Sequence, residues 1–202
     1  MIILDVEASG TEYQKHSIVS IGAFDFANPT NRFYEECRIW EIDGERAHLM
    51  EGALEVNGFT EEEITDRTKQ SEGEAVEKFL AWSEAIADRT LCGQNPSFDR
   101  DFVRAAAGRA HLNYNLPYRT LDTHTMCFMH MTKAGYEPPI DPAHKRTRLN
   151  LNAILNYCGI TAEPDPHNAL TGALCHGEVA SRLLYDKQLL PEFEQFEIPW
   201  QQ

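Results

Sequence analysis

The first apolar segment of the chain constrains its fold most, because this segment carries two acidic residues. Residues 2–6 are short and apolar, which is typical of a buried strand. Since side chains alternate across a strand, Asp5 and Glu7 lie on the same face. Carboxylates this close repel each other unless a positive charge lies between them, and divalent metal ions with oxygen ligands usually provide that charge. Taken alone, however, such a pair is more often a strand end that runs into solvent.

The pattern beyond this segment predicts strands first and helices later. Two further strands are expected at 17–26 and 32–40, and three strands in succession predict an antiparallel meander. The pair Asn28-Pro29 is expected to end the second strand. A short strand is also expected at 90–92. Apolar residues at helical spacing predict helices over 74–87, 97–107, 150–158 and 166–185.

Local signals mark where several of these elements begin and end. Ser97 is an expected N-cap, Gly159 an expected helix stop, and Asp165-Pro166 an expected cap with proline in the first turn. The segment 135–147 contains three prolines and no periodicity, so we expect a loop. No linker divides the chain, and residues 1–202 are therefore expected to form a single domain.

Composition limits the class of protein and the kind of partner. Apolar residues make up 42% and charged residues 25% of the 202 residues, which excludes a disordered chain. Eighteen basic against 32 acidic residues give a net charge of −14, which argues against a non-specific grip on duplex DNA. No apolar run approaches the ~20 residues of a membrane span, so no membrane partner is expected. Five scattered cysteines, none spaced C-x-x-C, are typical of reduced thiols and indicate a cytoplasmic protein.

Two further motifs have ordinary explanations when each is taken alone. Asn95-Pro96-Ser97-Phe98-Asp99 places Asp99 in the first turn of a helix, where an acid complements the helix dipole. Pro166-His167-Asn168-Ala169-Leu170 places His167 in the first turn of the last long helix. A histidine there is more often structural or solvated than catalytic. Its place after both acidic motifs makes it worth considering with them.

Together the three motifs resemble a known family. A strand with D-x-E and a following glycine, then N-x-x-F-D, then H-x-A-L near the last helix is similar to the DEDDh 3'-5' exonucleases. This superfamily includes polymerase proofreading subunits, RNase T and oligoribonuclease. The resemblance covers about residues 2–186 and is supported by the segments 53–60, 121–123 and 151–160.

The resemblance implies both a fold and a reaction. The fold is an RNase H-like α/β fold with a mixed five-stranded sheet flanked by helices. The reaction is hydrolysis of phosphodiester bonds at the 3' ends of single-stranded DNA or RNA, with two divalent ions, Mg²⁺ or Mn²⁺, as cofactors. Asp5 would bridge both ions, Glu7 would bind the ion that carries the attacking water, and Asp99 would serve the other ion. His167 would take the proton from that water, as neutral imidazole can near neutral pH.

The same resemblance assigns residues to the substrate. Ser9, Gly10 and Thr11 follow the first motif, where the family places the 3'-terminal nucleotide, and a glycine lets backbone approach closely. Asn95 and Phe98 match positions that line the same cleft, although an aromatic residue in a helix is more often core. A basic group either guides the phosphate backbone or is simply solvated: Lys145, Arg146 and Arg148. No motif reads a 2'-OH, so the sequence does not choose between DNA and RNA.

The chain departs from the family at one expected ligand. The family motif H-x-A-x-x-D ends in an aspartate, and Gly172 occupies that position. A weakened or silent nucleic-acid-binding module, an active site completed by water and phosphate, and a substitute ligand all remain open. His176 points back over the same patch of helix and is the better substitute, whereas Glu178 points away. A solvated or core-edge histidine is still the more ordinary interpretation of His176, and the helix is expected to accept an aspartate at position 172.

Two questions about size and assembly also stay open at this stage. A phosphodiesterase for dinucleotide-sized products would fit the acidic surface as well. The tail is apolar enough to pack on the core or on a second subunit, which leaves a homodimer open. The tail residues concerned are Leu189, Leu190, Phe193, Phe196, Ile198 and Trp200.

Overall fold

A five-stranded sheet lies at the centre of the computed structural model, which describes residues 1–163 and 167–201. The strands follow the order β3-β2-β1-β6-β7. They are β1 (Ile2–Ala8), β2 (Ile18–Asp25), β3 (Asn28–Glu36), β6 (Leu91–Gly93) and β7 (Thr120–Asp122). β2 is antiparallel to β1 and β3, whereas β6 is parallel to β1 and β7. The early meander and the mixed five-stranded sheet are therefore both confirmed.

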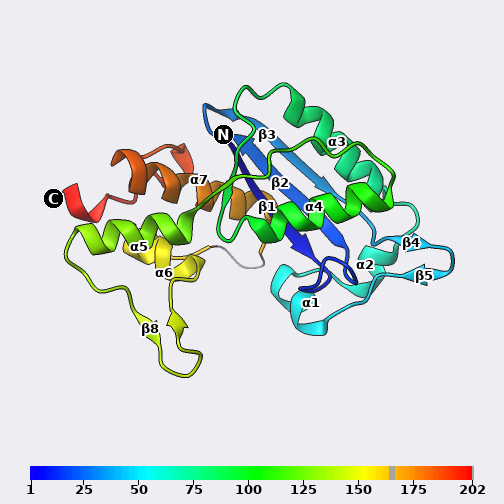
Figure 1. Ribbon diagram of the computed structural model, residues 1–202, viewed down its shortest axis with the longest axis horizontal. Helices are drawn as coiled ribbons and strands as arrows, with labels where there is room; N and C mark the ends of the chain where they lie inside the picture. The colour runs from blue at the N-terminus through cyan, green and yellow to red at the C-terminus, as the bar shows by residue number, and fades with distance from the viewer. Residues whose placement is uncertain (164–166, 202) are drawn as a thin grey trace.

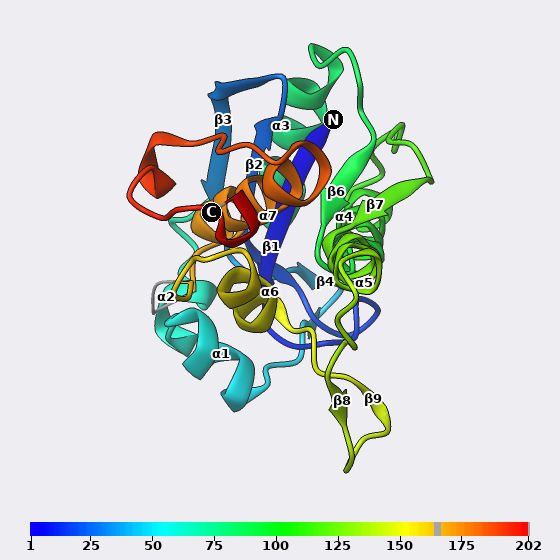
Figure 2. The ribbon, with the colours of Figure 1, turned by 90° about the vertical axis from the view of Figure 1, so that its left-hand side faces the viewer.

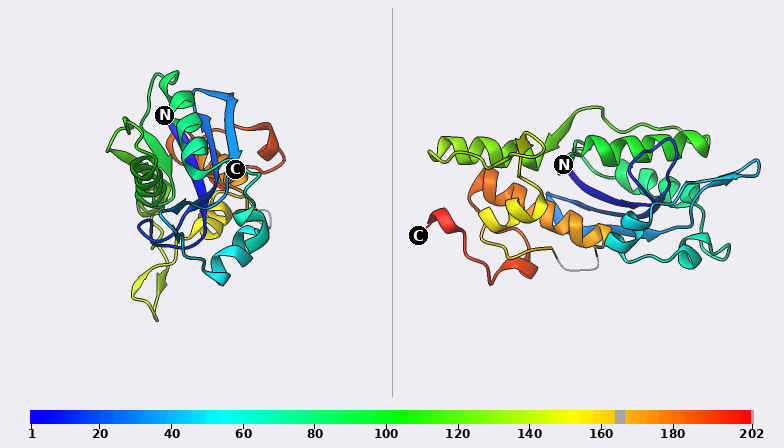
Figure 3. Two further views of the ribbon diagram at one scale, coloured as in Figure 1. Left: turned by 90° about the vertical axis from the view of Figure 1, so that its right-hand side faces the viewer. Right: turned by 90° about the horizontal axis from the view of Figure 1, so that it is seen from below.

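Helices cover both faces of this sheet (Figure 1). α3 (Glu72–Glu84) and α4 (Ser97–Arg109) pack on one face, and α7 (Ala169–Tyr185) packs on the other. α5 (Thr123–Lys133) and α6 (Leu151–Tyr157) lie against α7. The right-hand view of Figure 3 shows the sheet between α4 above and α7 below. The architecture is thus the predicted α/β sandwich of a sheet between helical layers.

The pleat of β1 divides its side chains between two cores. Its even-numbered side chains, from Ile2 to Ala8, belong to the core under α3 and α4. Ile3 belongs to the other core, which is formed with α7. Because Asp5 and Glu7 share the face of Ile3, they point toward α7 at the carboxyl end of the strand. The alternation that buries β1 on both sides therefore also aims its two acids at one helix.

A glycine on β2 lets the first turn of α7 lie directly on the sheet. Gly22 pairs with Asp5 in the antiparallel ladder. A Cβ atom at Gly22 would lie 2.1 Å from the backbone carbon of Ala169 and 2.2 Å from the backbone nitrogen of Leu170. These separations are far below van der Waals contact, so any side chain at position 22 would push the helix outward. The start of α7 is thereby held beside Asp5.

The structure corrects two of the expected elements. β3 begins at Asn28, so Asn28-Pro29 starts a strand of the hairpin and does not separate the strands. The expected loop 135–147 carries a short hairpin, β8 (Ile140–Asp141) with β9 (Arg146–Thr147), which projects from the body in Figure 2. Strands of two residues are too short to show a periodic pattern in the sequence. Six further elements were not predicted either: α1 (Glu51–Asn57), α2 (Glu61–Thr65), α5, β4 (Glu41–Ile42), β5 (Glu45–Arg46) and β7.

The C-terminal tail packs on the core of its own chain. After α7 it forms two short 3-10 helices, Pro191–Phe193 and Pro199–Gln201. Five of the apolar tail residues lie against the core formed with α7: Leu189, Leu190, Phe193, Phe196 and Trp200. The apolar tail is therefore accounted for within one chain, and the homodimer stays a prediction that the tail does not support.

Two expectations from the sequence concerned the state of the cysteines and the crossing of a membrane. All five cysteines are buried and free. Burial raises the pKa of the Cys92 thiol to about 12, which keeps this side chain in its unreactive protonated form. Within residues 1–163 and 167–201, no helix combines the length and the apolar character that crossing a bilayer requires.

Candidate active site

The acidic pair lies at the carboxyl end of β1, facing α7. Asp5 and Glu7 are each half-buried. Burial raises the pKa of both carboxyl groups, and repulsion adds to this effect: from Glu163 on Asp5, and from Asp5 on Glu7. The pKa of Glu7 rises to about 8. Neighbouring acids with raised pKa values indicate a place where an added positive charge would be favourable.

Asp99 joins this pair from the first turn of α4. The residue is 4% exposed, and its Oδ1 accepts a hydrogen bond of 3.0 Å from the N–H of Val6. Burial raises the pKa of Asp99, and the charge of Asp5 raises it further. An acid that only complemented the helix dipole would remain in solvent. The structure instead brings Asp99 against β1, where it bonds to Val6, the residue between Asp5 and Glu7 in the sequence.

His167 lies before α7, which corrects its expected place in the first turn of the helix. α7 begins at Ala169 because the side chain of Asn168 caps it, accepting hydrogen bonds from two N–H groups of the first turn. The cap expected at Asp165-Pro166 lies outside the described residues. α4 likewise begins at Ser97 itself, so Ser97 is not its N-cap.

The contacts of His167 hold it close to the acidic pair. Its backbone N–H donates to the carbonyl oxygen of Val56 over 3.2 Å, at the end of α1 (Glu51–Asn57). Its Nε2 lies 3.9 Å from Oε2 of Glu163. A positive charge on His167 lowers the pKa of Glu7, which shows that the imidazole is within electrostatic reach of that carboxylate.

The space beside Gly172 is occupied by two carboxylates. A Cβ atom at Gly172 would lie 2.3 Å from Oδ2 of Asp5 and 3.1 Å from Oε1 of Glu163. An aspartate at position 172 would therefore require the end of the Asp5 side chain to turn aside, and the expectation that the helix itself accepts an aspartate stays a prediction. Glu163 itself was not singled out by the sequence, since it stands in an aperiodic segment between two helices. Only the missing acid at position 172 could have prompted a search for another nearby.

His176 reaches the site, but it does not fill the space at Gly172. The residue is 3% exposed, and its Nε2 lies 3.4 Å from Oδ1 of Asp5. Burial lowers the pKa of His176, and its Nδ1 has no hydrogen-bond partner among the described residues. Glu178 points away from the site and pairs with Arg182 at 2.7 Å, as its place on the helix predicted.

Two of the predicted substrate residues serve the loop after β1. Ser9 is fully buried, and its hydroxyl donates to the carbonyl oxygen of His48 over 2.8 Å and accepts from the N–H of Ser17 over 3.0 Å. Gly10 is buried under the ring of His16, since a Cβ atom at Gly10 would lie 2.1 Å from that ring. In this structure the Ser9 side chain and the lack of a side chain at Gly10 are needed for packing. The Ser9 hydroxyl thus holds the loop, and the expected contact of Ser9 with the substrate stays a prediction.

The other three predicted substrate residues are more accessible. Thr11 and Asn95 are exposed, and Phe98 is half-buried. Asn95 adopts a φ of 51°, and its N–H donates to Oδ1 of Asp122 over 3.0 Å, which fixes the turn before α4. The ring of Phe98 packs on Phe102, with ring centroids 4.8 Å apart. Phe98 thus combines a core contact with a partly open face.

The donor set fits hard divalent cations. Asp5, Glu7, Asp99 and Glu163 offer carboxylate oxygens, which Mg²⁺ and Mn²⁺ prefer. Their mutual repulsion is the cost that bound cations would remove. Among the described residues, no group of three or more such side chains is already arranged as a complete ion-binding cluster. The carboxylates would therefore have to turn toward an ion, as Asp5 now turns toward His176.

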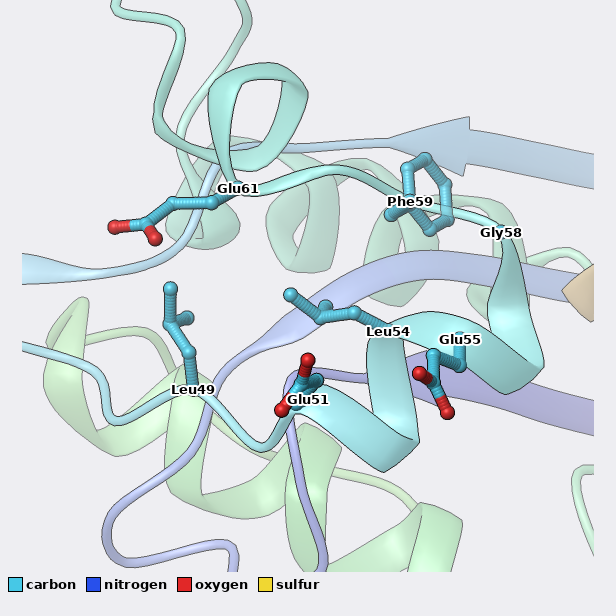
Figure 4. Close-up of a pocket in the computed structure, with 7 residues that line it drawn as sticks. All are labelled: Leu49, Glu51, Leu54, Glu55, Gly58, Phe59 and Glu61. Carbon is cyan, nitrogen blue, oxygen red and sulfur yellow. The ribbon is translucent and has the colours of Figure 1, made fainter.

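Two surface hollows lie close to elements of the site. Figure 4 shows the first, of about 580 Å³, between α1 and the start of α2. It is lined by Leu49, Glu51, Leu54, Glu55, Gly58, Phe59 and Glu61. Three glutamates make this hollow unsuitable for a phosphate backbone. The second, of about 470 Å³, lies between β9, α6 and the turn after β6, and includes Arg146 and Arg148, whose charge suits a polyanion.

Comparison with known proteins identifies the family. Residues 2–174 match the family model RNase T, described as exonuclease. The match covers most of the chain, so the chain belongs to this exonuclease family, and the resemblance to the DEDDh 3'-5' exonuclease superfamily is confirmed. A comparison with curated proteins finds no match.

Solved exonuclease structures share the fold at low sequence identity. E. coli exonuclease I in complex with a dA16 oligonucleotide is similar with a TM-score of 0.69 and 16% identity, over 93% of this chain and 41% of that one. Exonuclease I from Methylocaldum szegediense gives 0.67 and 16%, over 92% and 41%. The nuclease domain of 3'hExo, a DEDDh family member bound to rAMP, gives 0.66 and 17%, over 94% and 93%. The chain thus spans less than half of these exonuclease I chains but nearly all of the 3'hExo domain, and the shared fold is the RNase H-like one.

Proposed function

We propose that this chain is a metal-dependent 3'-5' exonuclease that removes nucleotides from single-stranded 3' ends. One observation carries the proposal: Asp5, Glu7 and Asp99 gather at the carboxyl end of β1, with His167 within electrostatic reach. Acids that only ended a strand or began a helix would not be brought together from two elements. The family membership of the chain supports the same reaction class.

Asp5, Glu7 and Asp99 would hold two divalent ions, Mg²⁺ or Mn²⁺. When bound, such ions neutralise the scissile phosphate and lower the pKa of a coordinated water. The chain needs this help because its net charge of −14 repels a polyanion. The charge of Asp5 raises the pKa of both Glu7 and Asp99, so Asp5 is the acid that is near both of the others. This position suits Asp5 to serve both ions.

His167 would act as the general base. Its side chain is 31% exposed, so it can meet a water molecule without leaving its place. A ring nitrogen of neutral imidazole takes the proton of the attacking water and releases it to solvent after cleavage. The hydrogen bond from its backbone to α1 fixes the main chain at this point, which keeps the imidazole close to Glu7.

The exposed residues around the site suggest how a single strand approaches. Thr11 follows the strand of Asp5 and Glu7, whereas Asn95 and the half-buried Phe98 flank the start of the helix that carries Asp99. Next to Asn95, the side chain of Gln94 donates to the carbonyl oxygen of Leu149 over 3.0 Å, beside the basic residues of the β8–β9 hairpin. Similar exonuclease I structures hold the oligonucleotides dA16 and dT13. This favours single-stranded DNA as the first substrate to test, with RNA beside it.

Digestion of end-labelled oligonucleotides tests the proposal. With Mn²⁺ or Mg²⁺ present, a 3' label should leave first as a mononucleotide, while a 5' label should pass through a ladder of shortened strands. Chelation by EDTA should stop both processes. The same assay on DNA, RNA and dinucleotides measures the preference that the sequence leaves open. Release of the 5' label first, or cleavage that ignores the chelator, would contradict the proposal.

The absence of an acid at position 172 favours one rival, a silent nucleic-acid-binding module. This rival predicts that the protein retains a single strand in a binding assay and leaves it intact at any metal concentration. Binding and cleavage measured on the same oligonucleotide separate the two functions.

A further inference from the structure

The position that the family motif assigns to its last aspartate is filled by other carboxylates in this chain. Gly172 faces Oδ2 of Asp5 and Oε1 of Glu163, the latter 3.1 Å from where its Cβ atom would lie. A carboxylate on the side chain of residue 172 would begin from that same point. The negative charge missing from α7 is therefore restored from the segment before it.

Glu163 is built into this place and not merely near it. Its side chain is 4% exposed. Its backbone N–H donates to Oδ1 of Asn152 on α6 over 3.2 Å, and the nearby Ile160 is 1% exposed in the core formed with α7. The main chain at Glu163 is thus held by α6 while its carboxylate is buried against the acids. A buried carboxylate needs partners, and His167 is one of them, with its Nε2 3.9 Å from Oε2 of Glu163.

The length of the glutamate side chain allows a residue outside α7 to supply the carboxylate that position 172 lacks. An aspartate on α7 would need only one methylene to reach the site, since the helix lies directly over Asp5. Glu163 reaches the same space from outside the helix, with its Oε1 3.1 Å from the Cβ position of residue 172. The glycine at 172 leaves room for both carboxylates, because a Cβ atom there would lie 2.3 Å from Oδ2 of Asp5 and 3.1 Å from Oε1 of Glu163.

We propose that Glu163 supplies the fourth carboxylate of the ion-binding site, in place of the aspartate that the family motif has at position 172. The inference rests on the proposed function, because it assumes that the acids bind divalent ions. On this assignment the chain has not lost its fourth carboxylate. The carboxylate comes from Glu163, before α7, and not from position 172 within the helix. His176 then contacts Asp5 without being the substitute.

Mn²⁺ titration of the purified, ion-free protein by calorimetry tests this assignment. Glu163→Gln keeps the shape of the side chain and removes its charge. Its Mn²⁺ affinity should fall at least about tenfold, because even the mutation of a residue that only supports a metal ligand lowers metal affinity by that much. The melting temperature of the ion-free variant should not fall, because repulsion among the acids is relieved. Glu62→Gln, an exposed glutamate on α2, is the matched control and should bind Mn²⁺ as the unaltered protein does.

A second variant moves the carboxylate back to the helix. In Glu163→Ala/Gly172→Asp the alanine removes one of the two carboxylates around position 172, and the end of the Asp5 side chain turns aside to admit the new aspartate. Mn²⁺ binding and cleavage should then recover relative to Glu163→Ala alone. Gly172→Asp in the otherwise unaltered protein should not tighten Mn²⁺ binding, because Asp5 and Glu163 already occupy the space. The double variant tests the assignment independently if Glu163→Gln folds poorly. A folded double variant that does not recover Mn²⁺ binding overturns the assignment.

The outcomes separate this inference from the proposed function. If the unaltered protein binds Mn²⁺ and cleaves, and Glu163→Gln binds Mn²⁺ like the control, Glu163 is not a ligand and only the inference fails. Loss of cleavage with unchanged Mn²⁺ affinity would also overturn it, because Glu163 would then act by positioning His167. An unaltered protein that neither binds Mn²⁺ nor cleaves removes the proposed function and the inference together.

Discussion

Two groups of buried acids in this molecule are held in different ways. Glu72 is 2% exposed and lies 2.8 Å from Nη2 of Arg109. It also accepts hydrogen bonds of 2.9 Å from the hydroxyl of Ser17 and the N–H of Ile18. Glu178 is fully buried, lies 2.7 Å from Nε of Arg182 and accepts from two backbone N–H groups of the tail. Each of these acids has a permanent cation and several donors.

The acids of the candidate active site lie beside each other and beside histidines. Asp5 is 3.4 Å from His176, and Glu163 is 3.9 Å from His167. Histidine is a titratable partner, unlike arginine. Burial alone therefore does not distinguish a structural acid from a functional one. An acid with an arginine belongs to the fold, whereas acids that repel each other keep a place for a charge brought from outside.

The largest effect is expected from Asp5→Asn. This change removes the acid at the centre of the repelling group, and metal-dependent cleavage should be abolished. The ion-free protein should keep its melting temperature, because loss of a repelled charge does not weaken the fold. Digestion of a 3'-labelled oligonucleotide and a thermal melt check both parts. Cleavage at the unaltered rate with metal present would show that Asp5 is a structural acid after all.

His167→Ala should lower the cleavage rate by about 10²–10⁴-fold, the usual contribution of a general base. Mn²⁺ affinity should stay nearly unchanged, because the imidazole meets water and not the ion. Single-turnover digestion and calorimetry on the same preparation separate the two quantities. A large loss of Mn²⁺ affinity would instead make His167 an ion ligand.

Arg182→Met tests whether a buried acid that is paired with an arginine contributes to stability and not to metal binding. It leaves Glu178 buried without its cation, and also removes hydrogen bonds of 2.8 Å to the carbonyl oxygens of Cys158 and Phe196. The free energy of unfolding should fall by about 3–5 kcal/mol, as for other buried pairs that lose one partner. Urea unfolding measures this loss, and Mn²⁺ affinity of the folded fraction should be unaffected. An unchanged stability would mean that the arginine is not what makes Glu178 tolerable.

The smallest effect is expected from Ser9→Ala. The hydroxyl joins His48 and Ser17, so its removal leaves buried polar groups unsatisfied and should cost about 1–3 kcal/mol of stability. Cleavage by the folded protein should change little, because the side chain faces the loop and not the strand. If KM for the oligonucleotide rises sharply while stability holds, Ser9 is a substrate contact and not only a residue that holds the loop.

Much of the fold could be predicted from the sequence because its elements depend on neighbouring residues. The alternation of β1 and the apolar spacing of α3 and α4 are local patterns, and they placed these elements within a few residues. The short hairpin β8–β9 and the exact start of α7 could not be found this way. The hairpin is too short to show a periodic pattern, and the cap expected at Asp165-Pro166 predicted an earlier start of α7 than the observed cap, Asn168.

The sequence by itself determined that Asp5 and Glu7 share a face, because the pleat of a strand requires it. It also determined which later motifs supply Asp99 and His167, and that position 172 lacks an acid. Only the tertiary structure decided what replaces that acid. Glu163 comes next to Asp5 because Gly22 lets α7 lie on the sheet and α6 holds the segment before it. Contacts between residues so far apart in the chain depend on how the helices pack on the sheet. Local sequence patterns do not predict this packing.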